Sequence, residues 1–407
     1  MASALQGVKV LELCSFVAGP YCTKLLADMG ADVVKVERPW IGDEARRRGP
    51  FYNGQTGLDA SLLFIYLNSN KRGITLDVSL PTGRDMMLGL LKQTDLLVED
   101  LSTREAERLG LDYPSLHEAN HGLVVTSITP FGRSGPHRDY KAHYMNTYHS
   151  GGDGYLLPAG RLVDQLYPQG GPIKAGGYLG EYQAGLSASL ATMAALVGRL
   201  LDGGGQHVDV SKQETLINLN SADFCKYPDR GFMEGRRNRH LSHYIGGLYR
   251  CKDGFWELLI PSQRHWEAML NVMGNPDWAA DEKFATQESS VAHRDEVDEK
   301  IEAWAMNYTK EEIYHSLQEQ GCAAGPVYST REVLQDPQME HRGFFAEMEH
   351  PGVGKFKAPS APYRLSHTPW AARRPSPSLG QHNGEIYGSW LGYDIEELTR
   401  LRQKGVI

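Results

Sequence analysis

A glycine-rich stretch from Gly176 to Gly185 delivers one carboxylate, Glu181, to the start of a long apolar segment, residues 186–197. Glycine has no Cβ, so such a backbone can approach a ligand closely. The first N–H groups of a helix lack partners within the helix and favour negative charge, so we expect Glu181 to stay ionised. An ionised carboxylate beside exposed amides is a candidate nucleophile or base. An acid in a first helical turn can equally be a simple capping group, and this stretch alone leaves both interpretations open.

Other side chains with chemical potential are His137, His143 and His149. Their even spacing of six does not place them on one helical face, and no paired carboxylate motif accompanies them, so we do not expect a metal site. The five cysteines are scattered and form no CxxC pair, which argues against zinc and against a disulfide framework.

The elements that position Glu181 follow an alternating pattern. Residues 8–13 and 32–37 are typical of strands, and a helix opening at Gly19-Pro20 separates them. Further strand patterns alternate with helical ones at residues 74–77, 95–99, 123–128 and 206–211. Strands joined by helices of this length predict an α/β fold with a parallel sheet.

Ligands of such sheets bind at the carboxyl ends of the strands, where Arg38, Asp100 and Thr129 would fall. The first strand-to-helix turn, residues 14–20, lacks the GxGxxG phosphate-binding glycines. We therefore do not expect a nicotinamide or flavin dinucleotide.

The pattern changes in the middle of the chain. A hairpin over residues 249–260 and two polar helical stretches predict a second, smaller α+β domain at residues 222–335. Residues 1–221 and 336–407 would then form the large domain. A basic run, residues 236–240, is either solvated or anion-binding.

Composition limits the possible functions. The chain has 407 residues, 41% of them hydrophobic, and a net charge of −8. A net negative charge does not favour binding to nucleic acid or to an anionic membrane, so we expect neither as a partner. No leader pattern is visible and no apolar run approaches about 18 residues, so we expect a cytoplasmic protein.

Ordered blocks along nearly the whole chain resemble the class III coenzyme A transferases, the family of formyl-CoA and carnitine-CoA transferases that also contains acyl-CoA racemases. The blocks with this resemblance are residues 7–13, 18–20, 26–37, 42–43, 70–72, 76–77, 204–211, 324–327, 336–337, 379–382 and 405–407.

The resemblance implies a Rossmann-like large domain built from both chain ends, a small domain between them, and two interlocked subunits. It also implies a mechanism in which an aspartate attacks an acyl-CoA thioester and gives a mixed anhydride. The CoA thiolate then forms an enzyme-bound thioester, which the acceptor carboxylate displaces. Backbone N–H groups of glycine-rich segments would stabilise the oxyanions.

The family's aspartate falls at Glu181, whose side chain is longer by one methylene, about 1.5 Å of reach. Glu181 is then a working nucleophile in a reshaped pocket, an acid–base residue, or the relic of an inactive subunit. In the last case the chain would pair with an active paralogue, as in benzylsuccinate CoA-transferases. The resemblance therefore implies a homodimer or a heterodimer that acts on an acyl-CoA, such as succinyl-CoA, and a free carboxylic acid.

The resemblance also implies which residues hold CoA, which enters as a substrate and is not a resident cofactor. The residues expected at the CoA site are Phe16, Arg38, Leu76, Asp100, Leu101, Arg108 and Lys141. Arginine suits phosphate because its planar fork makes two charged hydrogen bonds. Asp100 and Leu101 depart from the family's Asn-Phe pair, and the added negative charge of Asp100 is expected to weaken CoA binding.

Val17 and His143 are expected to contact the acyl group. His143 also matches a histidine of the racemases, which favours a 2-methylacyl-CoA racemase as a further alternative. The racemases' second glutamate has no counterpart in residues 259–264.

Overall fold

The computed structural model describes residues 3–158, 160–220, 224–225, 227–228 and 244–407, so the basic run at 236–240 lies outside the described residues. The chain divides into two compact units. The first contains Met1–Gly152, Ala175–Asn220 and Gln338–Ile407, and the second contains Asp153–Lys174 and Ser221–Pro337. The segment Asp153–Lys174 was expected in the large domain but groups here with the second unit.

The first unit is organised around a parallel sheet of six strands in the order β3-β2-β1-β4-β5-β6. Its strands are β1 (Lys9–Leu13), β2 (Asp32–Glu37), β3 (Arg72–Thr75), β4 (Leu96–Glu99), β5 (Val124–Thr129) and β6 (His207–Ser211). All adjacent pairs run parallel. The expected mixed α/β fold with a parallel sheet is therefore confirmed, and the strand order is that of dinucleotide-binding folds.

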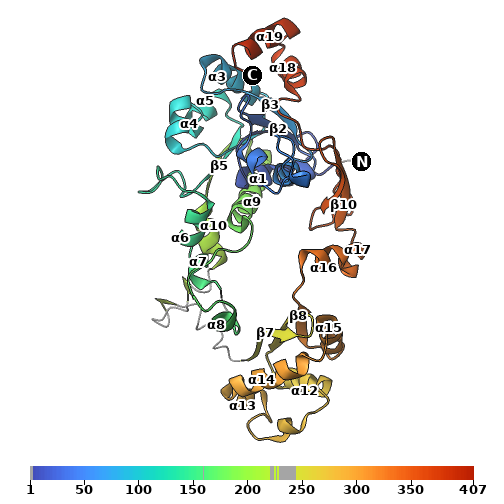
Figure 1. Ribbon diagram of the computed structural model, residues 1–407. Coiled ribbons are helices and arrows are strands. Elements are labelled where there is room, and N and C mark those ends of the chain that lie inside the picture. The colour runs from blue at the N-terminus through green and yellow to red at the C-terminus, as the bar shows by residue number, and fades with distance from the viewer. Residues whose placement is uncertain (1–2, 159, 221–223, 226, 229–243) are drawn as a thin grey trace. The chain divides into compact units, whose positions relative to one another are not determined.

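Helices cover both faces of the sheet (Figure 1). The helices and short 3-10 turns of this unit are α1 (Ala18–Asp28), η1 (Glu44–Arg47), η2 (Tyr52–Gly54), α2 (Leu62–Leu67), α3 (Pro81–Leu91), α4 (Thr103–Leu109), α5 (Tyr113–Ala119), α6 (Tyr144–Ser150), α9 (Leu179–Asp202), α10 (Lys212–Leu219), α18 (Asn383–Leu391) and α19 (Ile395–Gln403). A hairpin of β10 (Phe345–His350) and β11 (Gly354–Pro359) completes the unit.

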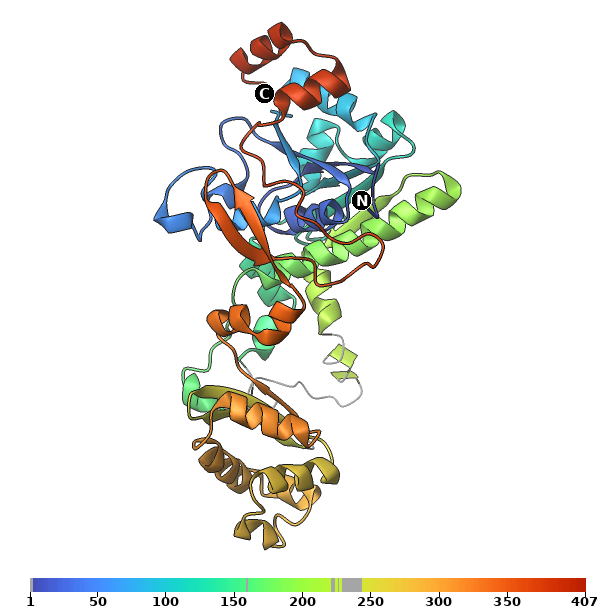
Figure 2. The ribbon, with the colours of Figure 1, turned by 90° about the vertical axis from the view of Figure 1, so that its right-hand side faces the viewer.

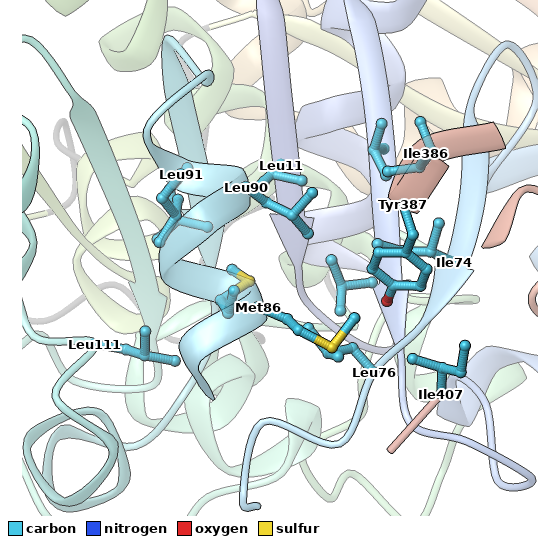
Figure 3. Packing of buried hydrophobic residues seen from close by; sticks show 14 of the residues in the cluster. Leu11, Ile74, Leu76, Met86, Leu90, Leu91, Leu111, Ile386, Tyr387 and Ile407 are labelled. Carbon is cyan, nitrogen blue, oxygen red and sulfur yellow. The ribbon is translucent and has the colours of Figure 1, made fainter. Parts of the chain in front are cut away.

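Alternate residues of each strand point to opposite faces, so the sheet contributes side chains to two separate hydrophobic cores. On one face, Leu11 packs with Met86 and Leu90 of α3 and with Tyr387 of α18 (Figure 3). On the other face, the neighbouring Val10 packs with residues of α1 and α9. The C-terminal helices are thus part of the first core, because they bury apolar side chains against strands formed by the N-terminal half.

Helix α9 runs beside α1, as Figure 2 shows. Gly185 permits this closeness, because a Cβ there would lie 2.5 Å from the carbonyl oxygen of Ala18. By length and composition α9 could also span a membrane, which corrects the expectation that no apolar run approaches that length. Packing on the sheet accounts for part of this character, because Ala184, Ala188 and Ala195 are buried there, whereas Leu190, Leu200 and Leu201 are exposed.

The second unit contains a three-stranded antiparallel sheet in the order β7-β8-β9. Its strands are β7 (Ile245–Cys251), β8 (Gly254–Ile260) and β9 (Ala323–Pro326). Its helices are α7 (Asp153–Leu156), α8 (Val163–Leu166), α12 (Gln263–Val272), η3 (Asp277–Ala280), α13 (Gln287–Ala292), α14 (Arg294–Ala305), α15 (Lys310–Glu319) and α16 (Thr330–Gln335), and α17 (Pro337–His341) crosses the boundary between the units. Buried Trp256 and Trp266 anchor its core.

Candidate active site

The strand order reverses between β1 and β4, and the loops that follow these two strands meet there. The backbone N–H of Ser15, after β1, donates a hydrogen bond to Oδ2 of Asp100, after β4, at 2.9 Å. Ligands of open parallel sheets bind at such a switch point, outside the carboxyl ends of the strands. The site is therefore built from the loops at this edge.

Glu181 lies in the first turn of α9 and is 3% exposed. Its Oε2 atom accepts a hydrogen bond from Nζ of Lys212 at 2.7 Å. Within the described residues α9 has no side-chain cap, and the carboxylate of Glu181 is directed to Lys212 instead. The geometry therefore favours a buried, charge-paired carboxylate over the capping interpretation.

Lys212 was not identified from the sequence. It is the first residue of α10 and directly follows β6, so it emerges at the same carboxyl edge of the sheet. The side chain of Lys212 is 17% exposed. Its position one residue beyond the strand pattern 206–211 could have indicated a site residue. Its pairing with Glu181 was not visible in the sequence, because the two residues are 31 positions apart.

The carboxyl group of Asp100 has a raised pKa, whereas the sequence suggested a fixed negative charge there. Burial raises its pKa to about 7, and the Ser15 hydrogen bond and the positive charge of Lys212 only partly offset this effect. The carboxyl group of Asp100 therefore keeps its proton to a higher pH than an ordinary aspartate does. Because its charge is reduced, the expected repulsion of an anionic ligand is weaker than the sequence suggested.

The turn before α1 is held in an unusual conformation. Phe16 has φ +73°, a left-handed geometry that few bulky residues adopt. The Oδ1 atom of Asp43 accepts hydrogen bonds from the N–H groups of Phe16 at 2.9 Å and of Ala45 at 2.7 Å. A conformation of this kind costs about 1–3 kcal/mol and persists only where the surroundings enforce it.

A chain of buried ion pairs begins at Asp43. Lys35 lies 2.6 Å from both Asp43 and Glu12, and Lys71 lies 2.8 Å from Glu12. Burial would raise the pKa of Glu12, but the two lysines outweigh it and lower that pKa to about 2. Burial lowers the pKa of Lys71 to about 8 despite the attraction of Glu12. Removing one member would leave a buried charge uncompensated.

An aromatic cluster joins the β1 turn to the start of α9. The ring centroid of Phe16 lies 4.8 Å from that of Tyr178, the N-cap residue of α9, and 5.8 Å from that of His143. Tyr144 lies 5.1 Å from Tyr178. Phe16 and His143, both expected at the site, thus lie together, and Phe16 contacts the N-cap residue of the helix that carries Glu181.

Other expected site residues are distributed differently. Val17 and Leu76 are buried, and Leu101 packs against the core cluster that contains Leu76. Arg38, Arg108 and Lys141 are exposed, and they lie after β2, in the last turn of α4 and in the loop after β5. The contacts of the described residues do not join these three cations to Glu181.

The described residues contain no group of three His, Cys, Asp or Glu side chains placed to hold a metal ion. Three cavities of about 310, 290 and 520 Å³ open among the described residues of the first unit, and Glu181 lines none of them.

Comparison with known proteins identifies the family. A family model described as CoA-transferase family III matches residues 5–383. The chain belongs to this family. It is 33% identical over 406 residues to a succinyl-CoA–D-citramalate CoA-transferase of Chloroflexus aurantiacus, covering 99% of this chain and 98% of that protein.

Two further comparisons agree. A succinate–glutarate CoA-transferase of Agrobacterium fabrum is 31% identical over 389 residues, with 94% of each chain covered. The crystal structure of a CaiB/BaiF family protein from Brucella suis superposes with a TM-score of 0.84 at 28% identity, covering 96% of this chain and 100% of that one. The resemblance found in the sequence is thereby confirmed.

Proposed function

We propose that this chain transfers CoA from an acyl-CoA to a free carboxylic acid through covalent intermediates at Glu181. The observation that carries the proposal is the buried carboxylate of Glu181, paired with Lys212 at the ligand-binding edge of the sheet. A carboxylate without its hydration shell is a stronger nucleophile, and its burial excludes water from the activated intermediates.

The proposed sequence has four steps. The Glu181 carboxylate attacks the thioester carbonyl, the C–S bond breaks, and CoA thiolate leaves a mixed anhydride. The thiolate attacks the glutamyl carbonyl and releases the donor acid, which gives a glutamyl-CoA thioester. The acceptor carboxylate displaces the thiolate to form a second anhydride. The thiolate then attacks the acceptor's acyl carbon, which releases the new acyl-CoA and regenerates Glu181.

Binding roles follow from position and residue type. We assign the CoA phosphates and adenine to the exposed Arg38, Arg108 and Lys141, whose charge suits phosphate. The remaining CoA and substrate contacts are assigned to the residues expected from the family, namely Phe16, Val17, Leu76, Asp100, Leu101 and His143. CoA is a substrate here, and no resident cofactor is proposed.

We propose succinyl-CoA as the donor. By their names, the relative at 33% identity is a succinyl-CoA–D-citramalate CoA-transferase and one at 31% is a succinate–glutarate CoA-transferase, whereas others at 31% are formyl-CoA:oxalate CoA-transferases. Succinyl-CoA is therefore the first donor to test, with small dicarboxylic acids as acceptors.

The test is trapping with hydroxylamine. Purified protein is incubated with succinyl-CoA and hydroxylamine, and peptides are analysed by mass spectrometry. A glutamyl hydroxamate at Glu181 supports the proposal, and its absence in folded protein overturns it for the isolated chain. Activity that appears only on co-expression with a paralogue would identify the chain as the non-catalytic subunit of a heterodimer, the alternative that the glutamate in place of aspartate favours.

We also propose a dimer in the cytoplasm. Helix α9 exposes several leucines, among them Leu190 at 73% and Leu201 at 84% exposure, and such an apolar face is suited to a protein interface. Light scattering after size exclusion distinguishes a dimer from a monomer.

A further inference from the structure

Among the described residues Glu181 is the ion-pair partner of Lys212, and it is charged only while it is a free carboxylate. The Nζ atom of Lys212 lies 2.7 Å from Oε2 of Glu181, and the lysine side chain is 17% exposed. In each covalent intermediate of the proposed reaction, Glu181 is an anhydride or a thioester and has no charge. A largely buried ammonium group without a counter-charge is unfavourable, so a replacement anion is required at these stages.

The reaction itself supplies such an anion. When CoA thiolate attacks the glutamyl carbonyl of the first anhydride, the C–O bond breaks and the donor acid leaves as a carboxylate. The acceptor must later arrive as a carboxylate at the same glutamyl carbon. The free carboxylate is therefore present next to the acylated side chain at the glutamyl-CoA thioester stage, whereas at the two anhydride stages the free anion is the CoA thiolate.

We propose that Lys212 is the receptor for the free carboxylate substrate, exchanging the Glu181 carboxylate for the donor acid as it leaves and for the acceptor acid as it arrives. This inference rests on the proposed function. It assigns Lys212 to the acid and leaves the CoA portion to the cations Arg38, Arg108 and Lys141. It also explains why a transferase would bury a lysine against its own nucleophile.

The positions of the surrounding charges are consistent with this role. Asp100 is a second carboxyl group on which the charge of Lys212 acts, and it accepts a hydrogen bond from the N–H of Ser15 at 2.9 Å. The β1 turn therefore holds the carboxyl group of Asp100, whereas the ammonium group of Lys212 is held by the carboxylate of Glu181.

The first test uses acetate as a substitute carboxylate. Glu181→Ala removes the partner of Lys212 and leaves space beside its ammonium group. We expect acetate, titrated at constant ionic strength against chloride, to raise the melting temperature of Glu181→Ala saturably. The wild type and the Glu181→Ala/Lys212→Met double variant are the controls and should not respond. An equal response of the single and double variants would overturn the inference.

The second test is kinetic and uses otherwise wild-type protein, so it stands even where Glu181→Ala does not fold. Lys212→Met should raise KM for the acceptor acid about 10- to 100-fold, the value of a hydrogen bond to a charged group. KM for acyl-CoA should stay within about twofold, and Lys212→Arg should restore part of the acid affinity. Equal changes in both KM values would overturn the inference.

Hydroxamate formation at Glu181 distinguishes a failure of the proposed function from a failure of the role of Lys212. If wild-type protein forms no hydroxamate at Glu181, the proposed function fails whatever acetate does. If the hydroxamate forms but the acid KM of Lys212→Met is unchanged, only the role of Lys212 is refuted.

Discussion

Shortening the proposed nucleophile by one methylene tests whether the site is built around glutamate. Glu181→Asp withdraws the carboxylate by about 1.5 Å. The 2.7 Å contact with Lys212 would then lengthen to about 4 Å, which is beyond hydrogen-bonding distance. A misplacement of about 1 Å in a reacting group can reduce a rate about 10²-fold. We therefore expect kcat to fall about 10²-fold.

The effect should be confined to the chemical step. The exposed cations assigned to CoA are untouched, so KM for acyl-CoA should change by less than about threefold. The assay follows formation of new acyl-CoA by chromatography, with hydroxamate formation as a second readout. Glu214→Asp is the matched control, because Glu214 is an exposed glutamate of α10, and its shortening should leave kcat unchanged.

Two results would refute this reasoning. Wild-type kcat in Glu181→Asp would mean that the contact with Lys212 does not set the reactive position. Wild-type kcat in Glu181→Gln would mean that this carboxylate performs no chemistry and that a partner subunit supplies the nucleophile.

Three further predictions concern stability. Glu12→Gln should lower the free energy of unfolding at pH 7 by about 3 kcal/mol in urea titrations, because two buried lysines lose a shared counter-charge. The folded-state pKa of Glu12, about 2, lies below its usual 4.5. Its contribution is therefore present above pH 4.5 and lost as the pH falls toward 2, so an unchanged wild-type–variant difference at pH 3 would contradict the assignment. The folded-state pKa of Asp100, about 7, lies above its usual 3.8. The protonated carboxyl group of Asp100 therefore stabilises the folded state fully below about pH 4, and this stabilisation is lost as the pH rises to 7. The loss is at most about 4 kcal/mol, at about 1.4 kcal/mol per pKa unit. Asp100→Asn should remove this pH dependence, and parallel curves for the two proteins would refute it. Gly185→Ala should lower the melting temperature, because its Cβ would lie 2.5 Å from the Ala18 carbonyl oxygen. Gly198→Ala in the same helix has only a flexible glutamine side chain nearby and should be neutral or stabilising; equal effects of both would argue against close packing of α9 on α1.

Glycines of the opening stretch have a different use from the one that the sequence suggested. Gly185 serves helix packing, since its missing Cβ lets α9 lie against α1. A Cβ at Gly176 would meet no atom within 4 Å, and Gly177 has φ +66°, a left-handed conformation that favours glycine. Sequence alone does not separate these roles, because both require the absence of a side chain.

Local pattern determined the parallel α/β fold and the position of Glu181 at a helix start. Alternating strand and helix periods depend on neighbouring residues, so they can be read directly, and the ordered family blocks identified the class. Only the tertiary structure decided the pairing of Glu181 with Lys212, the elevated pKa of Asp100 and the buried charges beneath Phe16. These properties arise from burial and from Coulomb interactions between residues far apart in sequence, which exist only once the strands have brought their carboxyl ends to one edge.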